Sequence, residues 1–159
     1  MNRIYFALGS NLGDRRANLR AALAALEEHV LPIHQRSAIW ESPPVPAGQP
    51  AYLNAVIASG TSLFPEVLLG ELKAIEHALG RRPSARWSPR PIDIDIVFFG
   101  DSAIETPALT VPHPRLAERA FVLAPLAEVL PGPLPVLGLS ALVLLERTGL
   151  QGAVRRESF

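Results

Sequence analysis

Two aspartates separated by a single residue lie in the stretch of residues 86–100. Asp93 and Asp95 alternate with three isoleucines, which is the pattern of a β-strand. Because side chains in a strand point to opposite faces with a period of two, both carboxylates project from one face, with their Cα atoms roughly 6.5–7 Å apart. Two carboxylates side by side repel each other, and desolvation adds to that cost. A cation between them removes the repulsion, so the pair is a candidate metal site.

Magnesium is the metal that this pair suits. Mg²⁺ keeps several waters and takes one or two carboxylates together with substrate phosphates. Two metal ions about 3.5–4 Å apart can clamp the attacking and leaving oxygens of a phosphoryl transfer, and the spacing of Asp93 and Asp95 is compatible with such a pair. The alternative is an exposed strand face that carries two solvated acids.

Four arginines precede the aspartates within ten residues: Arg81, Arg82, Arg86 and Arg90. Arginine recognises phosphate with two parallel hydrogen bonds. The metals would repel these arginines unless an anion lay between them, although all four could also be solvated loop charges. Trp87 lies in their midst and either covers a base or ring or packs the loop against the core. Together these residues indicate a site for a metal-chelated polyanion.

Further candidates have weaker patterns. Tyr52 and Asn54 share one strand face and suit a flat heterocycle with an amide-like edge, or form an ordinary sheet pair. His113 lies between two prolines and is structural unless its segment folds back over the aspartates. Phe121 by itself indicates core. Residues 9–14 lack the lysine that a phosphate-binding P-loop needs.

Composition indicates one compact domain, residues 1–159, with 48% apolar and 19% charged residues. Fifteen basic and fifteen acidic side chains cancel, which argues against a nucleic-acid partner. Fourteen of the basic residues are arginine, and there is no cysteine. We find no signal-peptide pattern, and the apolar run 136–145 is too short to span a membrane. We expect a cytoplasmic monomer with small-molecule partners.

The elements that position these residues follow from hydrophobic spacing. Strands are expected at residues 4–8, 33–40, 52–59 and 92–99, and helices at 14–29 and 65–79. This β-α-β-β-α-β order predicts a ferredoxin-like α/β (α+β) fold, an antiparallel sheet with two helices on one face. A small β-ribbon near residues 103–109 and short helices near 114–118, 121–129 and 139–147 complete the prediction.

Several motifs in their order along the chain resemble the hydroxymethyl-dihydropterin pyrophosphokinase family. They are A-L-G-S-N-L-G-D at 7–14, S-P-P at 42–44, Q-P-A-Y-L-N-A at 49–55, I-E at 75–76, G-R at 80–81, R-W-S-P-R-P-I-D-I-D at 86–95 and L-T-V-P-H-P at 109–114. The resemblance spans roughly residues 4–131. The P-R-P-I-D-I-D and L-T-V-P-H pieces are its more specific parts.

Membership of that family would imply transfer of the β,γ-pyrophosphoryl group of ATP to the hydroxymethyl group of the dihydropterin, with release of AMP, in tetrahydrofolate synthesis. Asp93 and Asp95 would hold two Mg²⁺ ions. The pterin would stack between Tyr52 and Phe121, and Trp87 would lie over the reacting end. The rival hypothesis is a non-catalytic ferredoxin-like module that binds a nucleotide or nucleic acid, in which the aspartate pair would serve no purpose.

The resemblance also implies a role for each matching residue. The catalytic residues would be Asp93, Asp95, Arg90, Arg81 and Arg119; the pterin contacts Ser42, Pro43, Val45, Tyr52, Asn54, Trp87 and Phe121; and the ATP contacts Glu76, Arg81, Arg82, Arg86, Trp87, Arg90, Ile96, Thr110, His113 and Arg119.

Three departures from the family pattern bear on these roles. Ser42 stands where threonine is common, and Lys73 stands where a glutamine is often found. Because the arginine loop contains Pro83 and is slightly short, the second phosphate-binding arginine is either Arg82 or Arg86.

Overall fold

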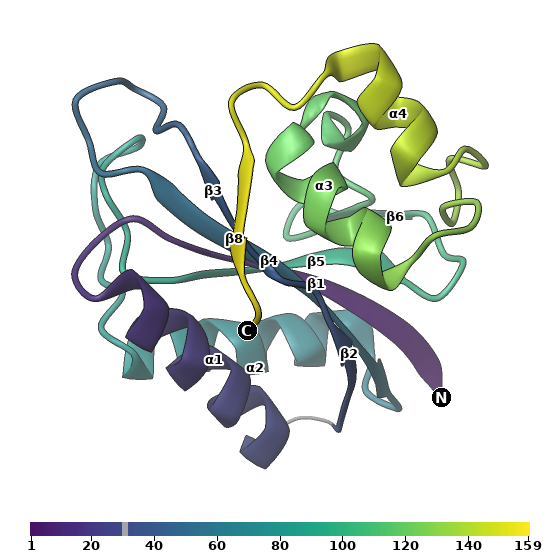
Figure 1. Ribbon diagram of the computed structural model, residues 1–159. Coiled ribbons are helices and arrows are strands. Elements are labelled where there is room, and N and C mark those ends of the chain that lie inside the picture. The colour runs from purple at the N-terminus through teal and green to yellow at the C-terminus, as the bar shows by residue number, and fades with distance from the viewer. Residues whose placement is uncertain (30–31) are drawn as a thin grey trace.

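An antiparallel sheet with helices on both faces forms the molecule (Figure 1). The computed structural model describes residues 1–29 and 32–159. Its elements are β1 (Asn2–Ser10), α1 (Arg15–His29), β2 (Ile33–Arg36), β3 (Ile39–Ser42), β4 (Tyr52–Thr61), α2 (Pro65–Ala78), β5 (Asp93–Phe99), β6 (Ile104–Glu105), β7 (Thr110–Val111), the 3₁₀ helix η1 (Leu116–Glu118), α3 (Ala120–Val129), α4 (Ala141–Thr148) and β8 (Val154–Glu157). None of the helices within these residues is long and apolar enough to cross a bilayer.

The strand order is β5-β1-β4-β3-β8, and β2 pairs with another part of β4. The strand pairs are antiparallel, and α1 and α2 cover the same face (Figure 1). The predicted ferredoxin-like order of strands and helices is therefore confirmed.

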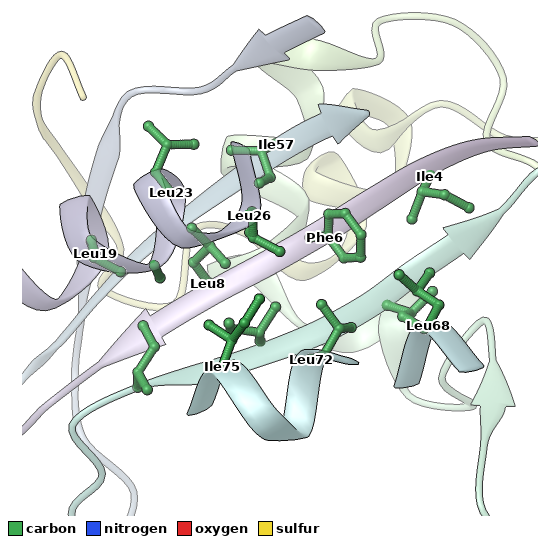
Figure 2. Packing of buried hydrophobic residues seen from close by; sticks show 14 of the residues in the cluster. Ile4, Phe6, Leu8, Leu19, Leu23, Leu26, Ile57, Leu68, Leu72 and Ile75 are labelled. Carbon is green, nitrogen blue, oxygen red and sulfur yellow. The ribbon is translucent and has the colours of Figure 1, made fainter. Parts of the chain in front are cut away.

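The first core lies between the sheet and the helices α1 and α2 (Figure 2). Every second residue of β1 points into this core, because strand side chains alternate between faces. The helix residues that meet them are three or four apart, because a helix turn has 3.6 residues. The labelled members are Ile4, Phe6, Leu8, Leu19, Leu23, Leu26, Ile57, Leu68, Leu72 and Ile75. Full burial of such a side chain contributes roughly 1.5–3 kcal/mol, whereas an exposed ion pair contributes roughly 0–1 kcal/mol. Burial therefore dominates the stability of this layer.

A second core covers part of the opposite sheet face. Tyr5 and Phe98 meet there edge to face, with ring centroids 6.1 Å apart. They pack with residues of α3 and α4, among them Val122, Leu123, Leu126 and Leu144. The cluster reaches along the sheet as far as Val56 and Val97. Toward Gly9 this face carries polar side chains, among them Asn54 and Asp93, and the site predicted from sequence lies there.

The predicted strand 33–40 is wrong as a single element, because the chain breaks into β2 and β3 around Ser37. The Ser37 amide donates to Val56 O, and the Val56 amide donates to the Ser37 hydroxyl oxygen, both at 2.9 Å. The buried hydroxyl thus takes the place of a backbone partner, which a hydrophobic pattern does not reveal.

The β-ribbon predicted at 103–109 is formed by β6 and β7 and extends to Val111. Strand β8 was not predicted. β8 reads Val-Arg-Arg-Glu and lacks apolar alternation. Ion pairs help to hold it: Arg155 Nε lies 3.0 Å from Glu128 Oε2, and Arg156 Nη2 lies 2.7 Å from Glu41 Oε1.

Candidate active site

The register of β1 with its two neighbours places the predicted residues on one face. Gly9 lies opposite Asp93 on β5 and opposite Asn54 on β4. Ala7 lies opposite Asp95, two residues along the same strands. A Cβ at position 9 would come within 3.6 Å of both Asn54 Oδ1 and Tyr52 Cδ1. Glycine and alanine in the central strand therefore leave a shallow floor between the aspartates and the Tyr52–Asn54 pair.

Two arginines lie against Asp93. Arg81 Nη1 is 2.5 Å from Asp93 Oδ1, and Arg90 Nη1 is 3.3 Å from Asp93 Oδ2. All three side chains are less than one-third exposed, so water screens these pairs less than it would at an open surface. Two of the four candidate arginines thus lie against Asp93.

Glu76 lies behind this cluster and is almost wholly buried. Its Oε2 accepts a hydrogen bond from the Ile94 amide at 2.8 Å and lies 3.3 Å from Arg81 Nη1. Its Oε1 is 3.4 Å from the Lys73 ammonium, so the lysine that departs from the family pattern has a partner here. Glu76 thus fixes both the start of β5 and the position of Arg81.

The pKa of Asp95 is raised to about 6. Its side chain reaches solvent, yet partial loss of hydration is the largest cause, and the negative charges of Asp93 and Glu76 add to it. Lys73 and Arg81 act in the opposite direction without cancelling the shift. Within residues 1–29 and 32–159 no ion pair forms to Asp95, so its negative charge remains undercompensated.

Ser42, Asn54 and Tyr52 form the other half of the face. The buried Asn54 donates through Nδ2 to Ser42 Oγ at 2.8 Å, which fixes the orientation of the amide. Burial and the negative charge of the nearby Asp93 raise the pKa of Tyr52. Its hydroxyl therefore stays protonated.

Three loops are joined by two residues that the sequence analysis missed, Asn11 and Gln49. The fully buried Asn11 donates to Gln49 Oε1 at 3.2 Å and to Pro50 O at 3.4 Å, and its Oδ1 accepts from the Arg90 amide at 2.8 Å. Gln49 Nε2 in turn donates to Trp87 O. The sequence signals for this link are an asparagine in the turn at 9–14 and a glutamine in the proline-rich stretch at 43–50.

The 109–121 segment folds back toward the aspartates, which is the condition under which His113 becomes a site residue. β7, with Thr110, lies beside β5. The pKa of His113 is lowered by burial and by the positive charges of Arg119 and Arg115. Burial and Arg115 also lower the pKa of Arg119, whereas the nearby charge of Asp95 acts in the opposite direction.

Phe121 is partly exposed rather than core, and the Arg119 guanidinium lies 5.8 Å from its ring centroid. This contact places an aromatic face beside the arginine that approaches Asp95.

Other predicted residues stand apart from the carboxylates. Arg82 donates to the carbonyl oxygens of His77 and Arg81, and Arg86 lies over the Trp87 ring, 4.8 Å from its centroid. Trp87 is half exposed and has a φ of 70°. Pro43 and Val45 are exposed at the start of their loop, and the Ile96 side chain packs into the first core, on the opposite face. Neither Arg82 nor Arg86 is thus singled out for phosphate.

Comparison with known proteins matches residues 5–131 to the family model for 7,8-dihydro-6-hydroxymethylpterin-pyrophosphokinase (HPPK). The 2-amino-4-hydroxy-6-hydroxymethyldihydropteridine pyrophosphokinase of Bacillus subtilis is 48% identical over 81% of this chain and 79% of its own length. The enzyme of that name from Pseudomonas aeruginosa is 44% identical over 82% of each chain.

Other relatives are larger proteins. The mitochondrial folate synthesis bifunctional protein of Arabidopsis thaliana is 42% identical over 81% of this chain, which spans only 24% of that protein. The crystal structure of Plasmodium falciparum HPPK-DHPS with pterin and p-hydroxybenzoate shares the fold, with a TM-score of 0.76 and 17% identity over 97% of this chain and 46% of that one. Since the family model covers most of the sequence and the bacterial relatives match along most of their own length, the chain belongs to the HPPK family.

Proposed function

We propose that the face formed by Asp93, Asp95, Tyr52 and Asn54 is the active site of this HPPK family member. There the β,γ-pyrophosphoryl group of ATP is transferred to the hydroxymethyl group of 6-hydroxymethyl-7,8-dihydropterin, which gives the dihydropterin pyrophosphate and AMP for tetrahydrofolate synthesis. One observation carries the proposal: the paired carboxylates and their arginines share a sheet face with a fixed amide and an aromatic ring. All of these groups come from one chain, and we propose a cytoplasmic monomer.

The carboxylates fit Mg²⁺. Both are oxygen donors. Lost hydration and the negative charges of Asp93 and Glu76 raise the pKa of Asp95, and Lys73 and Arg81 offset this only in part, so a bound cation would be stabilised there. We propose that Asp93 and Asp95 hold two Mg²⁺ ions together with the ATP phosphates. When bound, Mg²⁺ would neutralise phosphate charge in the transition state.

The arginines act on the phosphates. Arg81 and Arg90 reach Asp93 from the loop at 81–91, and Arg119 approaches Asp95 from the segment before α3. Phosphoryl transfer depends mainly on positioning and on charge stabilisation. We propose that the three guanidinium groups turn from the carboxylates to the phosphates when ATP binds, so that positive charge surrounds the transferred group. His113, Thr110 and the backbone of Ile96 would line the nucleotide side.

The pterin lies on the Tyr52–Asn54 half. Because Ser42 Oγ takes one amide hydrogen of Asn54, the amide keeps Oδ1 and one N–H for the edge of a heterocycle. Tyr52 and Phe121 offer aromatic faces for stacking, and the Val45 backbone offers further polar groups. Trp87 would close over the hydroxymethyl end.

The test is AMP formation from ATP, measured with and without the dihydropterin. We expect pterin-dependent AMP, a folded Asp95→Ala protein with no turnover, and an unchanged Asp101→Ala control, since Asp101 is an exposed aspartate just after β5. ATP binding without AMP would indicate a nucleotide-binding module instead. Full turnover by Asp95→Ala would overturn the assignment of the site.

A further inference from the structure

We propose that the C-terminal segment 149–159, which lies beyond the residues matched by the family model, is a brace that sets the distance between the two walls of the pterin site. The segment starts after α4 and crosses the sheet edge as β8 toward the side of α1, where the chain ends (Figure 1). Two of its residues, Gln151 and Gly152, contact the elements that carry Phe121 and Ser42. This inference rests on the proposed function.

Gln151 fixes the start of α3. Its Oε1 accepts from the Ala120 amide at 3.3 Å, and its Nε2 donates to Glu118 O at 3.0 Å. The first amides of a helix lack partners within the helix, and the N-cap residue Arg119 supplies no side-chain cap. Gln151 therefore holds the backbone on both sides of Arg119, two residues before Phe121.

Gly152 fixes the loop that follows Ser42. Its backbone has a φ of +83°, and a Cβ placed on it would lie 2.8 Å from Pro43 Cγ and 3.3 Å from Pro43 Cδ. A proline ring cannot swing away as a flexible side chain would. Any side chain at position 152 must therefore move Pro43, the neighbour of the Ser42 hydroxyl that orients Asn54.

The brace is anchored along β3 and against the first core. β8 pairs with β3, with Trp40 opposite Arg155 and Glu41 opposite Val154. Arg156 pairs with Glu41, and Phe159 packs against the first core. These contacts hold Gln151 and Gly152 beside β3, so the Phe121 wall cannot move away from the Ser42 wall without breaking the hydrogen bonds of Gln151.

Gly152→Ala tests the brace, with Gly149→Ala as a matched control. Gly149 also has a positive φ, +68°, but a Cβ placed on it would meet nothing within 4 Å. Both variants carry backbone strain, whereas only Gly152→Ala displaces Pro43. We expect the Kd of the dihydropterin to rise about tenfold in Gly152→Ala, since the loss of one hydrogen bond between Asn54 and the pterin is worth about that factor, and to stay unchanged in Gly149→Ala. The KM for ATP should stay the same in both.

A double-mutant cycle covers the case in which Gly152→Ala lowers stability. Removal of the ring in Pro43→Ala/Gly152→Ala takes away the clash, so the second substitution should cost much less pterin affinity in the Pro43→Ala background than in the wild type. Additive effects would overturn the brace.

The failure of the brace is distinguishable from the failure of the proposed function. If the wild type binds the dihydropterin and Asn54→Ala does not, the pterin site stands. Equal Kd values for Gly152→Ala and Gly149→Ala would then overturn the brace alone. If the wild type neither binds the dihydropterin nor forms AMP in its presence, the proposed function itself falls.

Gln151→Met gives an independent readout, because it keeps the length of the side chain and loses both hydrogen bonds. We expect higher KM values for the dihydropterin and for ATP, since Arg119 and Phe121 shift together. Gln151→Glu keeps an acceptor for the Ala120 amide and should recover part of the loss. An unchanged KM for both substrates in Gln151→Met would contradict the positioning role.

Discussion

Arg81 Nη1 lies 2.5 Å from Asp93 Oδ1, so an arginine occupies the carboxylate that is proposed to hold a metal. The same Nη1 lies 3.3 Å from Glu76 Oε2. Arg81 can therefore leave Asp93 without losing every partner, because Glu76 keeps part of its charge compensated. The ion pair makes the arginine and the metal competitors for one carboxylate until phosphate is present.

This competition predicts opposite effects of Arg81→Ala on metal binding and on turnover. Without nucleotide, Mg²⁺ should bind the variant more tightly, because Asp93 has lost a competing cation. AMP formation should fall by about 10³-fold, the effect typical of removing a charge-stabilising arginine from phosphoryl transfer. Isothermal titration with Mg²⁺ and the AMP assay check the two effects.

Arg82→Ala is the control for that experiment. Arg82 bonds only to backbone carbonyl oxygens among its described contacts and should leave Mg²⁺ affinity unchanged. Weaker Mg²⁺ binding in Arg81→Ala than in Arg82→Ala would contradict competition at Asp93.

Asp95 predicts a pH-dependent stability. Its pKa rises from 3.8 to about 6 on folding, so the folded state binds the proton more tightly between these values. Stability of the metal-free protein should then fall as pH rises from about 4 to about 6 and stay lowered above that. Asp95→Asn removes this term, so its Tm should exceed that of the wild type at pH 7–8 and match it below pH 4.

Thermal unfolding from pH 3.5 to 8, without divalent metal, measures the effect. Asp101→Asn controls for the loss of one negative charge at an exposed position. A Tm for Asp95→Asn that lies below the wild type at pH 8 would show that Asp95 is well compensated.

Periodicity was enough to predict most of the fold and one face of the site. The alternation around Asp93 and Asp95 put both on one side of a strand, and the register with Gly9 confirms their common face with Asn54. β8 escaped prediction because charged pairs, rather than apolar alternation, attach it to β3.

The hydrogen bonds that hold the loops were equally hidden from sequence. Asn11 and Gln49 are 38 residues apart, and no local pattern links them. The sequence does not distinguish Arg82 from Arg86 as a phosphate ligand. The contact of Arg82 with the backbone and that of Arg86 with Trp87 depend on the path of the loop. Such long-range polar contacts follow only from the assembled fold.

The hydrogen bond between Asn54 and Ser42 predicts that pterin binding requires a hydroxyl group at position 42. Ser42→Ala leaves a buried amide hydrogen of Asn54 without its acceptor, which costs about 1–3 kcal/mol, and it frees the amide to rotate. We expect a higher KM for the dihydropterin, with the KM for ATP unchanged. Ser42→Thr keeps the hydroxyl and should retain wild-type KM values. Steady-state kinetics of the two variants check this, and equal KM values for alanine and threonine would contradict it.

The hydrogen bonds of Gln49 lead to a prediction about the loop at 81–91, which carries Arg81 and Arg90. This loop should be held in part by the loop that precedes β4. Gln49→Leu removes both the acceptor for Asn11 and the donor to Trp87 O, while the Arg90 contacts of Asn11 remain. Residues 81–89 should then exchange amide hydrogens faster, because opening of the loop breaks fewer contacts. AMP formation should fall through kcat, since closure of a loop commits the substrates to reaction.

Gln35→Leu is the matched control, because Gln35 is an exposed glutamine on β2, outside this cluster. Hydrogen exchange followed by mass spectrometry should show faster exchange at 81–89 in Gln49→Leu and no change there in Gln35→Leu. Identical exchange in both variants would mean that Asn11 alone holds the loop. In that case Asn11→Ala, which strips the Arg90 amide of its acceptor, should be the variant that releases it.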